Sequence, residues 1–345
     1  MIKTAFYDAK AYDMPSFIKF GNLKGIEFKF LETKLSADTV ELARGCDAVC
    51  VFVNDTVSKE VIDRLYDIGV KIIALRCAGY NNVDVEQAYG KIHVVHVPAY
   101  SPYAVAEHAM ALLLTSIRRI HKAYNRTRDF NFSLNGLTGF DLHGKTIGVI
   151  GTGKIGRILI DICKGFGMNV IAYDLYPAKD SGITYVPLDE LYERSDIISL
   201  HCPLTDDTRH MIDEKAISKM KKGVVIVNTS RGALINGEAL VDGLMERKVG
   251  AACLDVYEEE ADIFFEDRSG HILNDDVLSR LISMPNVIVT SHQAFLTEEA
   301  LENIAETTVN NIISFFENDG RCDNELCYRC GKIEQCKKQR NQKCF

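Results

Sequence analysis

Three ionisable side chains follow apolar runs rich in valine and isoleucine in the second half of the chain. Arg231 follows VVIVNTS, Glu260 follows AACLDV, and His292 ends NVIVTSH. A guanidinium can bind a carboxylate through two parallel hydrogen bonds and polarise a neighbouring carbonyl. A histidine can give a proton to a developing alkoxide, and a carboxylate beside it favours the imidazolium. The three side-chain types together suit hydride transfer to a 2-oxo acid.

A glycine-rich segment offers a place for the dinucleotide that such a reaction needs. Residues 151–156, GTGKIG, match G-x-G-x-x-G, follow the apolar run KTIGVI and open the helical pattern KIGRILIDICKGFG. The first glycine permits the turn, the second lets backbone approach the pyrophosphate, and the third packs helix on strand. Asp174 ends the next apolar run and would bind the adenosine ribose. Because no Arg or Lys follows it in DLYPA, NAD is favoured over NADP.

The elements that must position these residues alternate along the whole chain, which indicates an α/β fold with parallel sheets. Strands are predicted within residues 2–8, 27–32, 48–53, 71–76 and 93–98, and again within 145–151, 169–174, 196–201, 224–230, 251–256 and 286–292. Between the two series, residues 101–128 predict one long helix with Pro102 in its first turn. A last helix is predicted to end at Gly320.

Bulk composition excludes several classes of protein. The 345 residues suffice for two hydrophobic cores. A net charge of -8 argues against nucleic acid as a partner and gives no sign of attraction to a membrane surface. No apolar run approaches the roughly 20 residues of a membrane span, and the N-terminus shows no signal-peptide pattern. We therefore expect a cytoplasmic protein whose partner is a small molecule.

The order of the motifs resembles that of the D-isomer-specific 2-hydroxyacid dehydrogenases, most closely their fermentative NAD-dependent D-lactate branch. The motifs are AGYNNVD, VPAYSPYAVAEHA, GTGKIGR, HCPLT, NTSRGALI, LDVYEEE and SHQAF, and the resemblance extends to about Leu326. It implies two Rossmann-like parallel-sheet domains. An NAD-binding domain, residues 101–298, would be inserted into a smaller flavodoxin-like substrate domain, residues 1–100 and 299–326. The resemblance also implies a homodimer or homotetramer.

The resemblance further implies roles for individual residues. Arg231 would bind the substrate, His292 would donate the proton, and Glu260 would pair with the histidine. Glu258 and Glu259 are then expected to be ordinary loop charges. The implied substrate-binding residues are Phe52, Ala78, Gly79, Tyr100 and Phe295, with the backbone at 78–79 binding the carboxylate. The implied cofactor-binding residues are Gly151, Gly153, Lys154, Ile155, Gly156, Asp174, His201, Cys202, Pro203, Thr229, Ser230 and Asp255.

The implied activity is reduction of pyruvate to D-lactate with NADH. Two aromatic residues, Phe52 and Phe295, suggest a cramped pocket for a methyl-sized group. A bulkier D-2-hydroxy acid, such as phenyllactate or 2-hydroxyisocaproate, is the alternative within the family. An NAD-sensing binding scaffold is a second alternative, because corepressors of this superfamily keep the same Arg, Glu and His. Such scaffolds carry long disordered flanks that are missing from this chain.

The 11 cysteines are unevenly placed. Six lie between Cys46 and Cys253, mostly in apolar runs where a reduced cysteine is a small core residue. The other five, which could offer thiolates to zinc, are Cys322, Cys327, Cys330, Cys336 and Cys344. Their spacing does not follow the paired C-x2-C arrangement and no histidine accompanies them. We therefore predict no metal site and interpret residues 327–345 as a cysteine-rich basic extension.

Overall fold

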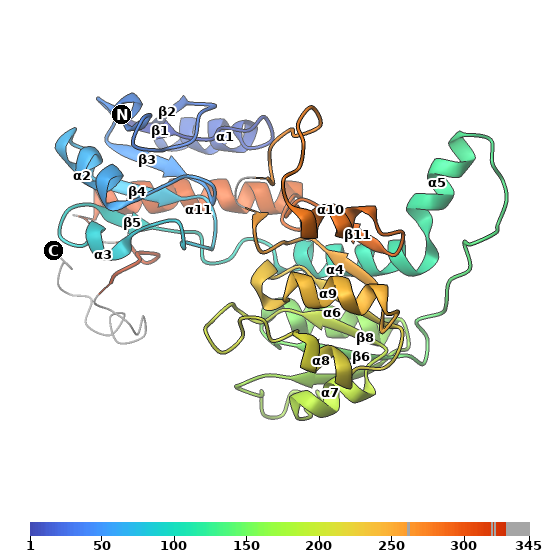
Figure 1. Ribbon diagram of the computed structural model, residues 1–345. Helices are drawn as coiled ribbons and strands as arrows, with labels where there is room; N and C mark the ends of the chain where they lie inside the picture. Colours follow the sequence, from blue (N-terminus) through green and yellow to red (C-terminus); the bar gives the residue numbers. More distant parts are fainter. Residues whose placement is uncertain (261–262, 319, 321, 329–345) are drawn as a thin grey trace. The chain divides into compact units, whose positions relative to one another are not determined.

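The computed structural model describes residues 1–260, 263–318, 320 and 322–328, and it divides into two compact units (Figure 1). Unit 1 comprises Met1–Ser101 and the described residues from Leu296 onward, and unit 2 comprises Pro102–Phe295. Every strand predicted from the sequence is present, and both sheets are parallel. The α/β interpretation is therefore confirmed.

Unit 1 is built on a five-stranded sheet of order β2-β1-β3-β4-β5, the flavodoxin-like order. Its strands are β1 (Ile2–Phe6), β2 (Ile26–Phe30), β3 (Ala48–Val51), β4 (Ile72–Leu75) and β5 (His93–Val95). Its helices are α1 (Met14–Lys24), η1 (Val40–Ala43), α2 (Lys59–Asp67), α3 (Val85–Ala88) and α11 (Glu298–Glu317). The chain returns at its end to complete this unit, because α11 packs on α1 and on β4.

Unit 2 is built on a six-stranded sheet of order β11-β10-β9-β8-β6-β7. Its strands are β6 (Thr146–Ile150), β7 (Asn169–Tyr173), β8 (Ile197–Leu200), β9 (Val224–Asn228), β10 (Val249–Leu254) and β11 (Val287–Val289). Helices α4 (Pro102–Arg118) and α6 (Lys154–Gly165) bury one core against the sheet. The second core lies under α7 (Leu188–Arg194), α8 (Glu214–Lys219), α9 (Gly237–Met245) and α10 (Asp276–Ser283). Since both faces are covered, the strands read as continuous apolar runs.

The prediction of one long helix over residues 101–128 is wrong. The helix α4 ends at Arg118, Arg119 adopts a left-handed conformation (φ 55°), and α5 (Ile120–Arg128) starts in a new direction. The reason is packing: α4 buries apolar side chains along its length, whereas α5 buries none. The break is held by Arg119 and Lys122, whose side chains both donate to the carbonyl of Pro285. Figure 1 shows α5 and the segment after it standing away from the sheet of unit 2.

No helix among the described residues combines the length and the hydropathy needed to span a bilayer.

Candidate active site

The parallel register of unit 2 aligns the carboxyl ends of all six strands along one edge of the sheet. Successive partners across this edge are Tyr173, Ile150, Leu200, Asn228, Leu254 and Val289. The residues that follow them in the chain are Asp174, Gly151, His201, Thr229, Asp255 and Thr290. All but the last of these are predicted cofactor-binding residues. Register therefore brings together residues that lie far apart in the sequence, at the edge where open α/β sheets bind ligands.

The glycine turn lies between β6 and β8, where the strand order reverses. Gly151 has φ 94°, and a Cβ there would lie 2.6 Å from the backbone of Cys202. A Cβ at Gly156 would lie 2.0 Å from the carbonyl oxygen of Gly151. At Gly153, in contrast, no atom lies within 4 Å of the Cβ position. The first and third glycines are thus required by packing, and the second leaves the N-terminus of α6 open to a ligand.

The side chain of Asp174 is held by hydrogen bonds from the glycine turn. Its Oδ2 accepts hydrogen bonds from the Thr152 N–H (2.6 Å) and hydroxyl (2.9 Å), and its Oδ1 accepts from the Tyr176 N–H (2.9 Å). Burial alone would raise the pKa of this carboxyl, but these hydrogen bonds and the nearby Arg157 bring the pKa below its usual value. The carboxylate therefore stays ionised at neutral pH, which suits a ribose diol and disfavours a 2′-phosphate.

The other predicted cofactor residues after β8 and β9 differ in what they present to this edge. The hydroxyl of Thr229 is buried and has no hydrogen-bond partner within the described part of the chain. Ser230 Oγ donates to the carbonyl of Cys202 (2.7 Å), which ties the two loops together. The Cys202 thiol points into the core, 3.6 Å from the Met211 sulfur. Burial lowers the pKa of His201 to about 4, so this imidazole is neutral and pairs with Ser199 Oγ (2.8 Å).

Lys154 and Ile155 open α6, Ile155 packing against the core, and Pro203 is exposed. The buried hydroxyl of Thr229, which has no partner within the described residues, needs a polar partner. Together with the open N-terminus of α6 and the ionised Asp174, this hydroxyl fits a bound dinucleotide.

His292 and Glu260 form a direct pair in unit 2. His292 Nδ1 lies 2.7 Å from Glu260 Oε1, and Glu260 Oε2 accepts from the N–H of Tyr257 (2.9 Å). Each side chain is 22% exposed, so the pair is shielded but reachable. Because the carboxylate faces Nδ1, the proton on that nitrogen is fixed and Nε2 is left for proton exchange with a ligand.

The guanidinium of Arg231, the predicted substrate-binding group, makes few contacts with the protein that the structure describes. Its Nη1 donates to the carbonyl of Ser230 (2.7 Å), and this is its one hydrogen bond within the described residues. The segment is fixed by the next residue, because a Cβ at Gly232 would lie 2.0 Å from the carbonyl carbon of Tyr257. The backbone next to Arg231 therefore rests on the segment that carries Glu260.

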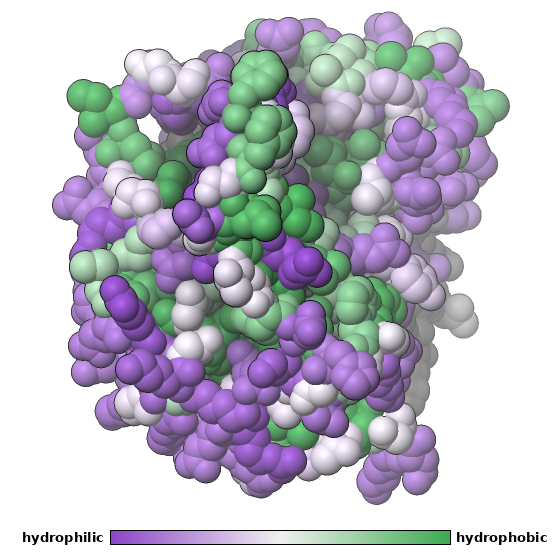
Figure 2. All heavy atoms as spheres, turned by 90° about the vertical axis from the view of Figure 1, so that its right-hand side faces the viewer, coloured by the Kyte–Doolittle hydropathy of each residue, from purple (hydrophilic) through white to green (hydrophobic). Residues whose placement is uncertain are grey.

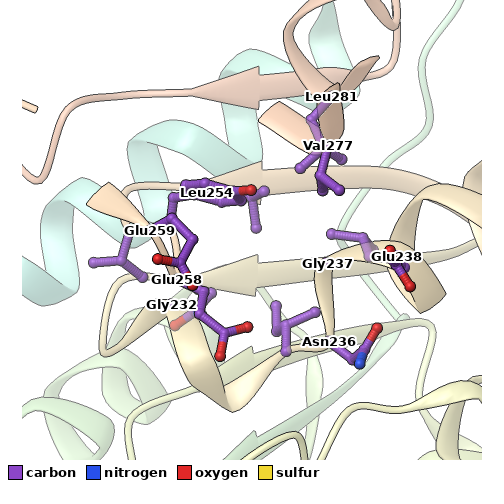
Figure 3. A pocket seen from close by; sticks show the side chains of 14 residues that line it. Gly232, Asn236, Gly237, Glu238, Leu254, Glu258, Glu259, Val277 and Leu281 are labelled. Carbon is purple, nitrogen blue, oxygen red and sulfur yellow. The ribbon is translucent and has the colours of Figure 1, made fainter. Parts of the chain in front are cut away.

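Gly232 and Tyr257 also line a cavity of about 230 Å³, which is drawn in Figure 3. Gly232, Glu258 and Glu259 form one side of it, and Gly237 and Glu238 lie opposite. Its lining includes none of Arg231, Glu260 and His292. The cavity is therefore distinct from the predicted acid–base site.

Asp255 organises the backbone around His292. It is fully buried, and its carbonyl accepts from the N–H of His292 (2.7 Å). Its carboxylate accepts from the N–H groups of Gln293 (2.9 Å) and Ala294 (2.8 Å). His292 has φ 51°, a conformation that histidine rarely adopts without such support. Asp255, predicted to lie beside the cofactor, thus also shapes the turn that carries His292, the predicted proton donor.

Two residues behave differently from the sequence-based expectation. Glu258 is not an ordinary loop charge, because its carboxylate binds both Arg209 and His210 and thereby joins two loops; only Glu259 is exposed. His108 on α4 is given no role by the sequence-based interpretation, yet its Nε2 lies 3.2 Å from Thr290 Oγ1 and 3.3 Å from Asp255 Oδ1. The sequence shows a histidine in AEHA but not the acceptors that it meets.

The predicted substrate-binding residues of unit 1 lie after three neighbouring strands: Phe52 after β3, Ala78 and Gly79 after β4, and Tyr100 after β5. The carbonyl of Ala78 accepts from His96 Nδ1 (3.0 Å), and that of Gly79 accepts from the Cys77 thiol (3.2 Å). Within the described residues, the N–H groups at 78 and 79 donate to no protein acceptor, which suits an incoming carboxylate.

The two phenylalanines predicted to contact the substrate side chain are buried. Phe52 is 6% exposed and Phe295, the last residue of unit 2, is 7% exposed. The carbonyl of Tyr100 accepts from Asn303 on α11 (3.0 Å).

The cysteines present no metal centre in the part of the chain that the structure describes, where no three His, Cys, Asp or Glu side chains gather to hold an ion. The six cysteines from Cys46 to Cys253 are reduced and buried. Cys322 is buried beside Asn311 and Cys327 is half-buried. Cys330, Cys336 and Cys344 lie outside the described residues.

Comparison with known proteins identifies relatives along almost the whole chain. Residues 110–294 match the family described as D-isomer specific 2-hydroxyacid dehydrogenase, NAD binding domain. A 2-hydroxyacid dehydrogenase homolog of Haemophilus influenzae is 53% identical over 90% of this chain and 95% of its own length. The D-lactate dehydrogenase of Escherichia coli is 51% identical over 94% of this chain and 100% of its own. The apo structure of D-lactate dehydrogenase from E. coli superposes with a TM-score of 0.87, at 49% identity, over 94% of this chain and 100% of that one. The chain therefore belongs to the D-isomer-specific 2-hydroxyacid dehydrogenase family.

Proposed function

We propose that this protein is an NAD-dependent D-lactate dehydrogenase that reduces pyruvate. The observation that carries the proposal is the 2.7 Å contact between His292 Nδ1 and Glu260 Oε1, which lies in the same unit as the glycine turn. The choice of pyruvate as substrate is supported by a relative that is 51% identical and matches over its full length, because that protein is named D-lactate dehydrogenase.

Arg231 binds the carboxylate of the 2-oxo acid in this proposal. Within the described residues its guanidinium makes one hydrogen bond, which leaves a fork of N–H donors for the ligand. In unit 1, the N–H groups of Ala78 and Gly79 donate to no acceptor within the described residues and so suit a carboxylate. The charge of the guanidinium also polarises the neighbouring carbonyl.

His292 gives the proton. When bound, the nicotinamide supplies the hydride that reduces the carbonyl carbon. The oxygen becomes an alkoxide, and His292 Nε2 protonates it. Glu260 holds the ring by Nδ1, so that Nε2 is the nitrogen that faces the ligand. The balance is pyruvate, NADH and one proton giving D-lactate and NAD.

Phe52 limits the size of the substrate side chain. Its ring lies 4.7 Å from the guanidinium of Arg76, its N–H donates to Asp55 Oδ2 (2.5 Å), and its carbonyl accepts from Asn82 (2.8 Å). Because these three contacts hold Phe52, the residue does not move aside readily for a larger substrate side chain. This rigidity supports a methyl-sized group over the larger side chains of phenylpyruvate and 2-oxoisocaproate.

In the proposal, residues 101–298 bind NAD and also carry Arg231, Glu260 and His292, and residues 1–100 with 299–326 form the substrate domain. The glycine turn, Asp174 and the orphan hydroxyl of Thr229 support the first assignment.

The protein is proposed to be a homo-oligomer. The segment after α5 exposes large apolar side chains, with Phe130 84%, Phe132 71% and Leu134 79% exposed. Figure 2 looks at the side from which α5 projects and shows hydrophobic side chains gathered there among polar ones. Exposed apolar groups of this size mark association surfaces. Sedimentation should show a dimer or a tetramer, and a monomer at micromolar concentration would contradict the proposal.

The activity is tested by following NADH oxidation with a panel of 2-oxo acids: pyruvate, phenylpyruvate, 2-oxoisocaproate, oxaloacetate and hydroxypyruvate. Pyruvate should give the highest kcat/KM, and the product should be D-lactate. A bulky acid ahead of pyruvate would refute the size argument from Phe52. NADH binding without turnover of any acid would instead indicate an NAD-sensing scaffold.

A further inference from the structure

A small polar network lies at the ends of β10 and β11, beneath the turn that carries His292. The Nε2 of His108 lies 3.2 Å from Thr290 Oγ1 and 3.3 Å from Asp255 Oδ1. Thr290 Oγ1 donates to the same Asp255 oxygen at 2.5 Å. The helix α4, which carries His108, packs across both strands. One ring nitrogen therefore meets two partners that come from neighbouring strands.

Asp255 depends on these donors because no part of it is exposed to water. Burial by itself raises the pKa of such a carboxyl. Hydrogen bonds from His108, Thr290 and Ala294 act against burial and bring the pKa of Asp255 below its usual value. The carboxylate is thus kept ionised by protein groups alone, and each lost donor leaves a buried charge less well satisfied.

The turn at His292 depends in its turn on Asp255. The Asp255 carboxylate holds the N–H groups of Gln293 and Ala294, and its carbonyl holds the N–H of His292. These contacts keep His292 in its left-handed conformation, from which its Nδ1 reaches Glu260. A carboxylate that rotated away would release two of the three backbone contacts.

We propose that His108 is a positioning residue for His292. Its Nε2–H, shared between Asp255 Oδ1 and Thr290 Oγ1, fixes the Asp255 carboxylate on the backbone of residues 293–294 and so keeps the His292 ring against Glu260. His108 acts through Asp255 and does not itself touch the reactants. The inference rests on the proposed function, because it treats His292 as the proton donor.

Four variants test the proposal. His108→Leu removes the donor at similar volume, and Thr290→Val removes the hydroxyl from the same network. His108→Gln keeps an N–H donor at the end of a side chain of similar reach. Ser116→Ala is the matched control, because Ser116 also links α4 to β10, through a hydrogen bond with Cys253 that does not reach Asp255.

Steady-state kinetics give the first readout. His108→Leu and Thr290→Val should lower kcat for pyruvate reduction about tenfold while KM and the Kd for NADH change less than about twofold. His108→Gln should recover most of kcat, and Ser116→Ala should match the wild type. Equal losses in kcat for Ser116→Ala and His108→Leu would mean a merely structural role and would overturn the proposal.

Hydrogen exchange of the peptide that spans residues 290–296 gives a second readout, one that needs no activity. Exchange should quicken about tenfold in His108→Leu and Thr290→Val and stay unchanged in Ser116→Ala. If His108→Leu does not fold, Thr290→Val decides. Wild-type exchange in both variants would overturn the proposal. A further outcome is that exchange quickens in the two variants while the wild-type protein reduces no 2-oxo acid. That result would support the network and reject only the proposed function.

Discussion

Two arginines near the carboxyl ends of parallel strands differ in how many hydrogen bonds they donate to the protein. Arg76, directly after β4 in unit 1, is 1% exposed. It donates to Asp13 (3.3 Å) and to the carbonyls of Tyr7 (3.0 Å) and Asp8 (2.7 Å). Its guanidinium also lies 4.4 Å and 4.7 Å from two phenylalanine rings, those of Phe6 and Phe52. Arg231, three residues after β9 in unit 2, is half-buried and donates one hydrogen bond within the described residues.

The difference teaches how to separate a structural cation from a ligand-binding one. Arg76 is 1% exposed and donates three hydrogen bonds inside unit 1, so it is out of reach of a ligand and serves to hold Phe52 and the end of β1. The arrangement is electrostatically expensive, since burial raises the pKa of Asp13 despite the neighbouring guanidinium. Arg231 has kept its donors. An arginine near a strand end is therefore informative only once its hydrogen bonds are counted.

The largest effect is expected from removing the structural cation. Arg76→Met should lower the free energy of unfolding by about 3–5 kcal/mol, because it leaves Asp13 buried without its partner. Urea denaturation followed by circular dichroism measures the loss. Arg44→Met, which removes only an exposed pair with Glu41, is the control and should change little. Equal stability of the two variants would contradict the structural role of Arg76.

The ligand-binding arginine should show the reverse pattern. Arg231→Lys should lower kcat/KM for pyruvate about a hundredfold while the midpoint of thermal unfolding stays within about 2 °C of the wild type, because a point charge cannot reproduce the guanidinium fork. Steady-state kinetics and a thermal melt of the same preparation test both halves. Full activity in the lysine variant would remove Arg231 from the site.

A smaller effect is expected at the partner of the proton donor. Glu260→Gln should lower kcat for pyruvate reduction about tenfold, because the His292 ring loses the carboxylate that orients it through Nδ1. Steady-state kinetics measure the loss. The exposed neighbour provides the control, Glu259→Gln, whose kcat should match that of the wild type. An unchanged kcat in Glu260→Gln would show that the carboxylate does not act on the histidine.

The strands and the glycine turn could be predicted because their signals are local. Apolar runs mark buried parallel strands, and the close approach at Gly156, which only glycine permits, appears in the sequence as a fixed spacing. The break at Arg119 was missed because the helical pattern continues through it. What ends α4 is the loss of a surface to pack on, together with the distant carbonyl of Pro285.

For the candidate site, the sequence by itself determined which side chains follow strand ends, and so named Arg231, Glu260 and His292 and predicted that the last two pair. Only the tertiary structure decided that Glu258 binds Arg209 and His210, that His108 contacts Asp255 and Thr290, and that Arg76 is buried among its partners. The physical reason is that hydrogen-bond satisfaction depends on partners brought together by sheet register and helix packing, and those partners lie 48 to 182 residues apart in the chain.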